Sequence, residues 1–295
     1  MNARVIVNPA SGGGRGSARV QGALQTLREH GWDLDVRETT GPGHASDLAV
    51  EAAEREVPVV LAAGGDGTTY EVVNGLFPAK GTVPRLGLLP VGTGNSFLRD
   101  FAITDLAAAV QAILRKQPRA CDVVRATHAQ GAVHYVNLLS LGFSAEVGAL
   151  TNRRFKGLGL AGYALATVGS LVRLDHPCFP YALDDGPRET APVVLLSFCN
   201  SRFTGGTMQM APAADPTDGA LDVIHVGAMR RRRLLGAFPK IYRGTHVHLP
   251  EVRTTTARSV RFDLSGPVPC MIDGEVCDLT LERLDVLPGA LQVFA

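Results

Sequence analysis

Three short runs of glycine and small hydroxylic residues are the first candidates for chemistry in this chain. They read NPASGGGRG at residues 8–16, GGDGTTYE at 64–71 and PVGTGNSF at 90–97. Glycine permits close backbone approaches that a side chain would forbid, and the N–H groups at the start of a following helix attract anions. Each run therefore suits a phosphate group. Asp66 is ill placed beside an anion unless a divalent cation such as Mg²⁺ lies between them.

The spacing of these glycines excludes two common phosphate-binding signatures. No G-K-[ST] occurs, so no run forms a P-loop, and Ser17 stands where G-x-G-x-x-G requires its third glycine. Three such loops on one edge of a sheet would surround a single polyphosphate. The alternative is that the glycines serve only tight turns.

The elements that must position these loops alternate between strand and helix as far as residue 120. This alternation predicts a doubly wound parallel sheet with the loops at its carboxyl edge. The expected strands are residues 3–8, 32–39, 57–63 and 85–90, and the expected helices are 16–31, 44–56, 68–77 and 104–117, the last capped by Thr104 or Asp105.

Beyond residue 120 the pattern changes to short apolar runs separated by Gly, Pro and Asp turns, which predicts a mostly antiparallel β domain. Expected strands are 121–127, 133–143, 192–200, 221–227 and 259–264, with helical interruptions at 157–174 and 230–244. His246 and His248 alternate on a possible strand, and we expect them at the surface. We therefore predict an α/β protein with domains at 1–120 and 121–295, in which the final strand, 284–295, joins either domain.

The composition indicates a folded chain without a bias towards polyanions. The 295 residues are 45% hydrophobic and 19% charged, with a net charge of +1, so we expect two cores and no nucleic-acid partner. Five scattered cysteines without a C-x-x-C pair fit a reducing cytosol. The first apolar run is too short for a signal peptide, and the longest, 157–172, is too short to span a bilayer. That stretch is either a core helix or a membrane-facing one, and we expect a cytoplasmic protein.

The motifs NPASGG, GGDGTTYEVVNGL and LPVGTGN, in this order and spacing, resemble the diacylglycerol kinase catalytic domain family. This family includes bacterial diacylglycerol and phosphatidylglycerol kinases, sphingosine kinases and ceramide kinases. The resemblance continues in VNLLSLGFSAEV, FTGGTMQMAPAADPTDGALDVIHV and MIDGEV, and it covers nearly the whole chain. It implies a nucleotide-binding α/β domain followed by a β-sandwich domain, with ATP and Mg²⁺ in the cleft between them and a lipid as the phosphoryl acceptor.

The resemblance assigns the nucleotide site to the three glycine-rich loops and their surroundings. Asp66 would act through Mg²⁺ and water, and Asp122 would belong to an Asp–water–Mg²⁺ network. The residues implied at the nucleotide are Asn8, Ser11, Gly12, Gly13, Thr40, Gly64, Gly65, Asp66, Gly67, Thr68, Glu71, Gly92, Thr93, Gly94 and Asn95.

Two further carboxylate groups match family motifs. Asp273 and Glu275, in DGE, match the site of the catalytic base, and the sequence leaves open which of them takes the proton; burial of one beside the other would raise its pKa to a useful value. The alternative is an Asp-Gly hairpin turn with a solvated glutamate. Asp215 and Asp218, with the carbonyl of Ala220, match a structural metal site that suits Mg²⁺ or Ca²⁺. A plain Asp-rich turn is the alternative.

Two departures from the family motifs bear on the substrate. Ser96 replaces the acidic residue of G-T-x-N-D, which removes a potential ligand of the Mg²⁺ network. Ser144 stands where many relatives have an aspartate that holds a sphingoid amine, although Glu146 could compensate. The second departure disfavours a free sphingoid base and leaves neutral lipids such as diacylglycerol or ceramide.

We therefore expect an ATP- and Mg²⁺-dependent lipid kinase that associates peripherally with a membrane surface and could form a homodimer. The basic run Arg230–Arg233, before LLGAFPKIY, could attract anionic headgroups or simply begin a solvated helix. Three alternatives stay open: a ceramide or sphingoid-base kinase of the same family, an NAD kinase, and a catalytically silent lipid- or nucleotide-binding protein, which Ser96 would permit.

Overall fold

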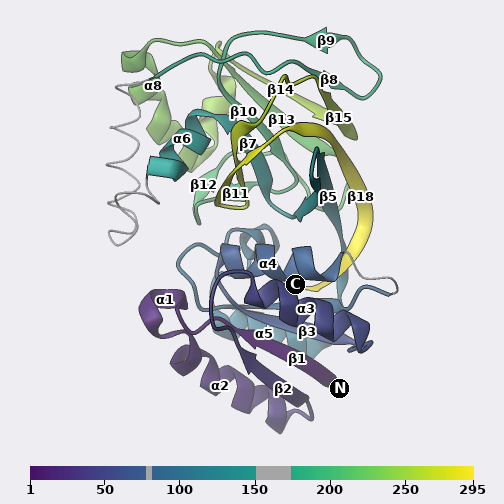
Figure 1. Ribbon diagram of the computed structural model, residues 1–295. Helices are drawn as coiled ribbons and strands as arrows, with labels where there is room; N and C mark the ends of the chain where they lie inside the picture. The colour runs from purple at the N-terminus through teal and green to yellow at the C-terminus, as the bar shows by residue number, and fades with distance from the viewer. Residues whose placement is uncertain (78–81, 151–173) are drawn as a thin grey trace.

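Four parallel strands form the centre of the N-terminal domain in the computed structural model (Figure 1), which describes residues 1–77, 82–150 and 174–295. Their order in the sheet is β2-β1-β3-β4. β3 is buried along its whole length, as expected for a central strand covered on both faces. The strands are β1 (Asn2–Val7), β2 (Asp33–Glu38), β3 (Val59–Gly64) and β4 (Arg85–Pro90).

Helices cover both faces of this sheet, so the predicted α/β class is confirmed. One face packs against α2 (Gly16–Glu29) and α5 (Leu106–Arg115), and the other against α3 (His44–Glu54), α4 (Asp66–Leu76) and part of α5. Asp105 caps α5 by accepting a hydrogen bond from the Ala108 N–H. The short helix α1 (Ser11–Gly14) lies in the first predicted loop, and the 3₁₀ helix η1 (Phe97–Phe101) begins at the end of the third.

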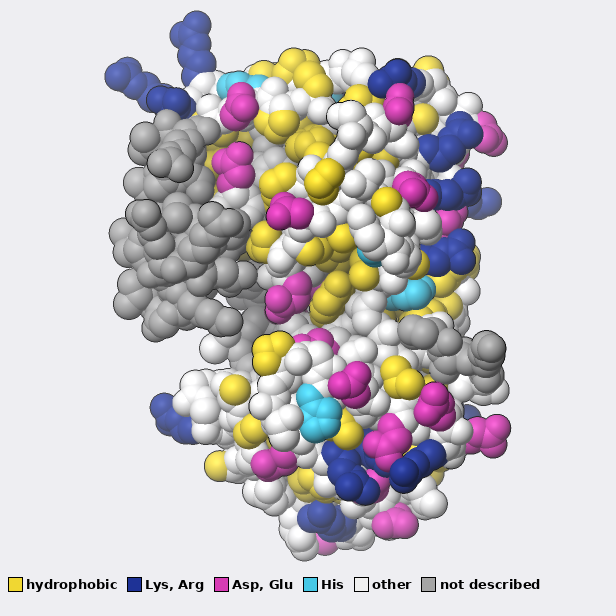
Figure 2. Space-filling model, viewed as in Figure 1, with side chains coloured by type: hydrophobic (Ala, Val, Ile, Leu, Met, Phe, Trp, Pro, Cys, Tyr) yellow, Lys and Arg dark blue, Asp and Glu magenta, His cyan; other side chains and the backbone are white. Residues whose placement is uncertain are grey.

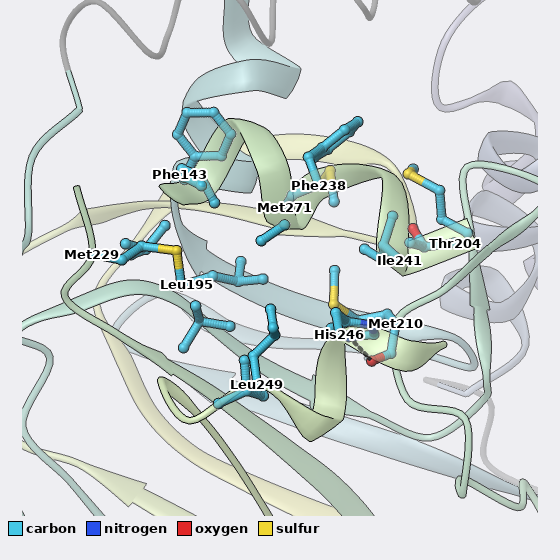
Figure 3. A pocket seen from close by; sticks show the side chains of 16 residues that line it. Phe143, Leu195, Thr204, Met210, Met229, Phe238, Ile241, His246, Leu249 and Met271 are labelled. Atoms are coloured by element: carbon cyan, nitrogen blue, oxygen red, sulfur yellow. Dashed lines mark hydrogen bonds between the residues drawn. The ribbon is translucent and has the colours of Figure 1, made fainter. Parts of the chain in front are cut away.

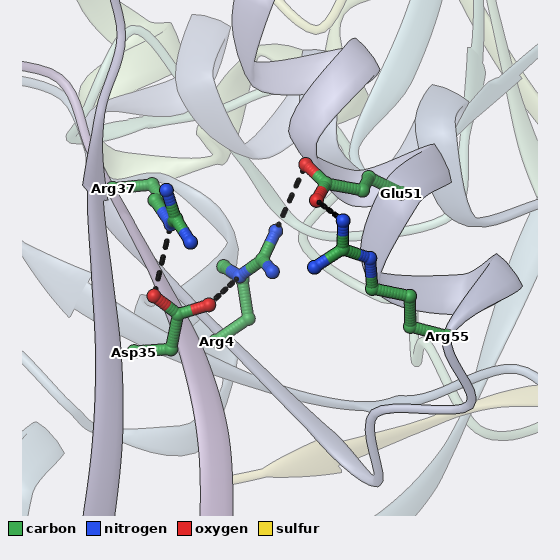
Figure 4. Close-up of polar contacts among 5 residues, drawn as sticks. All are labelled: Arg4, Asp35, Arg37, Glu51 and Arg55. Carbon is green, nitrogen blue, oxygen red and sulfur yellow. Dashed lines mark hydrogen bonds and ion pairs between the residues drawn. The ribbon is translucent and has the colours of Figure 1, made fainter.

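A chain of ion pairs ties β1 to β2 and α3 (Figure 4). The guanidinium of Arg4, whose side chain is 2% exposed, lies 2.8 Å from Asp35 and 3.4 Å from Glu51. Arg37 and Arg55 supply second partners to these two carboxylates. A buried guanidinium needs such partners, because an unpaired buried charge is costly. This network belongs to the scaffold and not to the candidate site.

The C-terminal domain is a sandwich of antiparallel strands. One sheet has the order β14-β13-β10-β7-β16-β17, and its partner contains β5, β6, β15, β8, β9 and the first part of β18. Side chains from both sheets meet in one core that includes Tyr135, Leu139 and Phe198. The strands are β5 (Arg119–His128), β6 (Gly131–Tyr135), β7 (Leu138–Gly142), β8 (Tyr181–Leu183), β9 (Arg188–Glu189), β10 (Val193–Cys199), β13 (Leu221–Gly227), β14 (Val252–Ala257), β15 (Ser259–Phe262), β16 (Val268–Ile272), β17 (Glu275–Leu279) and β18 (Leu281–Phe294).

β18 belongs to both domains. It pairs with β15 and β5 in the sandwich, shifts register between Leu287 and Leu291, and then runs parallel to β4 at Val293. Figure 1 shows this long yellow strand descending along one side of the molecule into the lower domain. The ten-stranded sheet is therefore continuous across the two domains.

Short helices cover the outer face of the six-stranded sheet. They are α6 (Phe143–Leu150), α8 (Arg231–Ala237), η4 (Phe238–Arg243) and η5 (Thr245–His248), with the small hairpin of β11 (Phe203–Thr204) and β12 (Met208–Gln209) beside them. The expected helix at 157–172 lies outside the described residues. Among the helices that are described, none is long and apolar enough to cross a membrane.

Two details differ from the sequence-based expectations. The single strand expected at 133–143 is divided into β6 and β7, because the N–H groups between them turn towards Asp273. The possible strand at His246 and His248 is the 3₁₀ helix η5, and the expectation that His246 lies at the surface is wrong: it is 7% exposed. Its ring packs inwards because η5 folds across the apolar side of the sheet.

Candidate active site

The three glycine-rich loops meet where the strand order of the parallel sheet reverses. The chain leaves β1 towards β2 on one side, whereas β3 and β4 continue on the other, and such a switch point opens a crevice at the carboxyl edge. The Asn8 side chain donates to the Thr68 hydroxyl at 3.0 Å, which joins the first loop to the second. The Gly92 N–H donates to the Gly64 carbonyl at 3.0 Å, which joins the third loop to the second.

Three of the glycines are required by close contacts between these loops. A Cβ atom on Gly92 would lie 2.5 Å from the Cα of Gly65, and one on Gly94 would lie 2.2 Å from a carboxylate oxygen of Asp66. A Cβ on Gly64 would collide with the Thr68 side chain at 2.2 Å. A Cβ atom does not tolerate such distances, so the close packing of these loops requires glycine at all three positions.

Asp66 begins α4 and is held by the third loop. Its two carboxylate oxygens accept hydrogen bonds from the Ser96 N–H at 2.7 Å and the Ser96 hydroxyl at 3.2 Å. Burial raises the pKa of Asp66, while the hydrogen bonds from Ser96 and the charge of Arg99 oppose that rise. The carboxylate is thus desolvated, and a nearby cation would stabilise its ionised form.

Asp273 lies in the turn of the β16–β17 hairpin, opposite Asp66 in the other domain. One of its oxygens accepts hydrogen bonds from the N–H groups of Asn137 and Leu138, both at 2.9 Å, and the other from Val136 at 3.0 Å. Burial raises the pKa of Asp273 to about 7, and the charge of Asp66 contributes to the rise. The hairpin therefore brings a second desolvated carboxylate to the crevice.

The side chain of Glu275 reaches the second glycine-rich loop directly. A Cβ atom placed on Gly67 would lie 2.8 Å from its carboxylate oxygen, so the side chain rests over the start of α4. Unlike Asp273, which is 5% exposed, Glu275 is open to solvent. The two DGE carboxylates thus have different environments: one is fixed in a nest of N–H groups, and the other faces the crevice.

The remaining predicted nucleotide residues surround this crevice at different depths. Thr68 is buried, Thr40 and Thr93 are exposed, and the Asn95 side chain donates to the Gly92 carbonyl at 3.0 Å. The Thr40 N–H and hydroxyl contact His44, whereas Glu71 accepts from the N–H groups of Gly43 and Ala45. Glu71 therefore secures the start of α3 within the protein. Ser11, Gly12 and Gly13 lie in α1, where both glycines have positive φ.

The proposed metal turn lies beside Asp122 at the junction of the domains. Asp122 accepts from the N–H groups of Gly219 and Gly289, at 2.6 and 2.7 Å, so it orders that turn and the bulge of β18. Asp215 and Asp218 accept from Thr217 and Ala220 within the turn. In the described part of the chain, no group of three or more His, Cys, Asp or Glu side chains is arranged to hold a metal ion.

Two contacts that the sequence did not reveal join the domains at the crevice. Arg202 donates to the Asp100 carboxylate at 2.8 Å and to the Asp100 carbonyl at 2.9 Å. The Gly206 N–H donates to the Ser96 hydroxyl at 3.0 Å, and Ser96 in turn holds Asp66. No local motif marks these pairs, because their members lie about a hundred residues apart in the sequence.

An apolar cavity opens on the outer side of the six-stranded sheet (Figure 3). Thr204 and Ile241 lie at one end and Phe143 and Met229 at the other. His246 is its main polar group; the ring Nε2 lies 3.0 Å from the Met210 carbonyl, and burial keeps the pKa of the ring low. Its lining is Phe143, Val194, Leu195, Thr204, Met208, Met210, Val226, Met229, Leu234, Ala237, Phe238, Ile241, His246, Leu249, Val252 and Met271.

The fold and this arrangement define a two-domain α/β and β-sandwich protein with a polar crevice between its domains. Family models agree with that division: the diacylglycerol kinase catalytic domain matches residues 2–126, and the YegS C-terminal NAD kinase beta sandwich-like domain matches residues 137–295. The chain belongs to the diacylglycerol kinase catalytic domain family, and it is a lipid kinase.

Similar proteins cover nearly the whole chain. It is 32% identical over 293 residues to a diacylglycerol kinase of Mycobacterium tuberculosis (strain ATCC 25618 / H37Rv), with 98% of this chain and 93% of the relative covered. A diacylglycerol kinase of Bacillus subtilis (strain 168) is 29% identical over 276 residues, with 92% and 89% covered. The crystal structure of a diacylglycerol kinase from Bacillus anthracis str. Sterne has a TM-score of 0.74 at 21% identity, covering 99% and 96% of the two chains, and shows the shared fold.

Proposed function

We propose that this protein transfers the γ-phosphoryl group of ATP, in a Mg²⁺-dependent reaction, to the hydroxyl of a diacylglycerol-like neutral lipid. The observation that carries the proposal is the meeting of Asp66 with Asp273 and Glu275 across the domain junction, beside the glycine-rich loops and next to an apolar cavity. The nucleotide-binding domain would comprise residues 1–120 and the end of β18.

The residues present fit a nucleotide with a divalent cation. Asp273 is buried and Asp66 is half-buried, burial raises the pKa of both, and the charge of Asp66 adds to the rise at Asp273. Two desolvated carboxylates at short range favour a cation between or beside them. Gly92 and Gly94 carry no side chains of their own and pack closely against Gly65 and the Asp66 carboxylate, which leaves their backbone open to phosphate oxygens.

Roles for individual residues follow from their exposure. Bound Mg²⁺·ATP supplies the phosphoryl group and neutralises part of its charge. The loop N–H groups and the start of α4 would bind the phosphates, and Asp66 would orient the cation. We assign the general base to Glu275, because it faces the crevice and a base must reach the hydroxyl it deprotonates. Asp273, whose oxygens are occupied by three N–H groups, would position the hairpin.

The cavity supports a lipid acceptor. Thr204 lies in its wall, and two residues along the chain Gly206 contacts Ser96 beside Asp66. An acyl chain in the cavity would therefore place its headgroup near the crevice. A pocket with this lining suits hydrocarbon and offers little to the polar groups of NAD, which argues against an NAD kinase. Ceramide stays the alternative acceptor; the side chain of Ser144 lies outside the part that the structure describes.

A basic surface beside the cavity supports peripheral binding to an anionic membrane. Between residues 228 and 250 the sequence contains six Arg and Lys residues and no Asp or Glu. Leu235 and Tyr242, 55% and 44% exposed, lie in the same segment as Leu234 and Ile241, which line the cavity. Figure 2 shows Lys and Arg side chains projecting at the upper left, where Figure 1 places α8. Each basic residue near an anionic surface contributes about 1 kcal/mol.

The acidic turn is proposed as a structural cation site. Asp215, Asp218 and the Ala220 carbonyl would supply oxygen ligands of the kind that Mg²⁺ and Ca²⁺ prefer. Asp122 would support this site by ordering the turn. A cation there would reinforce the contact between the turn and β5, and its removal by a chelator should lower the melting temperature of the protein in the absence of ATP.

The central test offers diacylglycerol, ceramide, sphingosine, phosphatidylglycerol and NAD separately, each with labelled ATP and Mg²⁺. We expect label in the phosphorylated neutral lipid, and its loss in an Asp66→Ala variant that still unfolds cooperatively. Label in NADP would support an NAD kinase. Retention of ATP with no labelled product would support a silent binding protein.

The membrane surface is tested by co-sedimentation with phosphatidylcholine vesicles that contain or lack phosphatidylglycerol. An Arg231→Gln/Arg232→Gln variant should lose binding to the anionic vesicles while it still phosphorylates lipid in detergent micelles. An Arg28→Gln/Arg115→Gln variant removes the same charge from the other domain and should bind like the wild type. Equal loss in both variants would contradict a localised surface.

A further inference from the structure

Cys270 and Cys277 face each other across the hairpin that carries Asp273 and Glu275. They are register partners in the antiparallel pair of β16 and β17, and their sulfur atoms lie 3.5 Å apart. Directly opposite residues in such a pair have Cα atoms separated by about 4.5 to 5.5 Å, which lies within the range that a disulfide spans. A small movement of the two strands is therefore enough to join the two sulfurs.

The two thiols differ in exposure and in pKa, as the two partners of an oxidation site should. Cys270 is buried, whereas Cys277 is partly exposed and accessible to a small oxidant. A hydrogen bond from Cys270 lowers the pKa of Cys277, and the same bond raises the pKa of Cys270. The thiolate, which is the reactive species, thus forms on the accessible sulfur, with a second thiol beside it.

The pair lies close to the groups of the proposed active site. Side chains two residues apart on a strand share a face, so Cys277 and Glu275 lie on the same face of β17. Tyr70, in the helix that begins with Asp66, packs on the same cluster as the two cysteines. Burial raises the pKa of Tyr70, and the charges of Cys277, Asp273 and Glu275 contribute. The two sulfurs therefore lie on the side of the hairpin that packs near α4.

We propose that Cys270 and Cys277 form a redox-active dithiol that closes to an intramolecular disulfide and misplaces Glu275. With hydrogen peroxide as oxidant, the Cys277 thiolate attacks one oxygen and releases hydroxide, which gives a sulfenic acid. Cys270 then attacks that sulfur, the S–S bond forms, and the S–O bond breaks with loss of water. Together two thiols and one peroxide give one disulfide and two waters, and a dithiol reductant reverses the change.

The consequence for the site is geometric. Closure brings the sulfurs from 3.5 Å to about 2.05 Å, which pulls the strands together two residues from Glu275. Misplacement of a reacting group by about 1 Å can cost up to 100-fold in rate. The disulfide form should therefore phosphorylate lipid at least tenfold more slowly.

The chemical arm of the test does not depend on catalysis. Trypsin releases residues 262–283 as one peptide that contains both cysteines and no other. After treatment of the full chain with peroxide, this peptide should be lighter by two hydrogen atoms and should regain them with dithiothreitol. Overoxidised or unchanged thiols in this peptide would overturn the proposal.

The activity arm rests on the proposed function and uses matched cysteine variants. Wild type and Cys178→Ser, which removes an exposed cysteine elsewhere, should both lose activity with peroxide and recover it with dithiothreitol. Cys277→Ser should keep its activity, and Cys277→Ala provides a second variant if the serine form folds poorly. Loss of activity in Cys277→Ser on treatment with peroxide would contradict control by this pair. If every form is inactive but the peptide still loses two hydrogen atoms, only the proposed kinase reaction is refuted.

Discussion

Ser96 holds Asp66 with both its N–H, at 2.7 Å, and its hydroxyl, at 3.2 Å. The same hydroxyl accepts a hydrogen bond from Gly206 of the C-terminal domain at 3.0 Å. Ser96 is 2% exposed, so these partners are not replaced by water. One small side chain thus fixes the acid at the start of α4 and links it to the opposite domain.

Replacing Ser96 with alanine should therefore impair both the site and its closure. The Gly206 N–H and one oxygen of Asp66 would lose a partner in a buried position, which costs about 1–3 kcal/mol in the free energy of unfolding. We also expect a lower kcat, because Asp66 would no longer be oriented. Ser197→Ala is the control, since it removes another buried hydroxyl, paired with Ser140 at 2.6 Å, from the core. Equal kcat values in both variants would show that Ser96 serves stability alone.

The two carboxylates of the DGE turn should respond differently to amide substitution. Glu275→Gln should reduce kcat by about 100-fold or more, the usual contribution of a general base, and leave the melting temperature unchanged, because the side chain is exposed. Asp273→Asn would turn an NH₂ group towards backbone N–H donors, and we expect a loss of about 1–3 kcal/mol in stability. Steady-state kinetics and thermal unfolding measure both effects. An active Glu275→Gln protein would transfer the role of base to Asp273.

Filling the apolar cavity should change the preference for acyl chain length. Ala237 lies in its wall, so Ala237→Phe should reduce kcat/KM for long-chain diacylglycerol and spare a short-chain analogue. Ala129→Phe adds the same ring to an exposed turn of the other sheet and should leave both substrates unaffected. A parallel loss for both chain lengths in Ala237→Phe would mean that the cavity does not hold the acyl chain.

His134 should make the domain junction sensitive to acid. Its ring stacks on Phe77 at 4.9 Å, and Asn74 of α4 bonds to its backbone. Burial lowers the pKa of His134 from 6.5 to about 4, so between these values the unfolded chain binds more protons than the folded one. The free energy of unfolding contributed by this residue therefore falls as the pH drops through that window, by at most about 3 kcal/mol.

His134→Phe keeps the stacking and removes the titration. Thermal unfolding from pH 7 to pH 4.5 should show a smaller acid-induced loss in this variant than in the wild type. The comparison between the two proteins matters, because Asp66 and Asp273 have raised pKa values, and their contributions to the free energy of unfolding change with pH in the opposite sense. Parallel curves for the two proteins would exclude His134 as the sensitive group.

The sequence predicted the N-terminal domain well because its signals are local. Each apolar strand ends in a glycine-rich loop and each helix follows directly, so strand and helix ranges near 57–63 and 85–90 could be assigned from pattern alone. Thr104 and Asp105 were identifiable as candidate caps for the same reason, and the structure shows that Asp105 is the cap. The diacylglycerol kinase motifs then selected the loops that the structure brings together.

The features that the sequence did not predict depend on contacts between distant segments of the chain. The pairing of Gly206 with Ser96, and the nest of N–H groups around Asp273, join residues separated by more than a hundred positions. The burial of His246 depends on how η5 crosses the sheet. The sequence treated the two cysteines of the hairpin as part of a scattered set, since only the register of β16 and β17 shows that they face each other.

The path of β18 limits how this protein can be divided. Val293 and Phe294 complete the parallel sheet beside β4, although they come from the far end of the chain. A fragment ending near residue 126 would lack that strand and leave the edge of β4 uncovered, which favours aggregation. Expression of the two halves as separate genes should therefore yield an insoluble N-terminal piece, unless the last residues are supplied as a fused or added peptide.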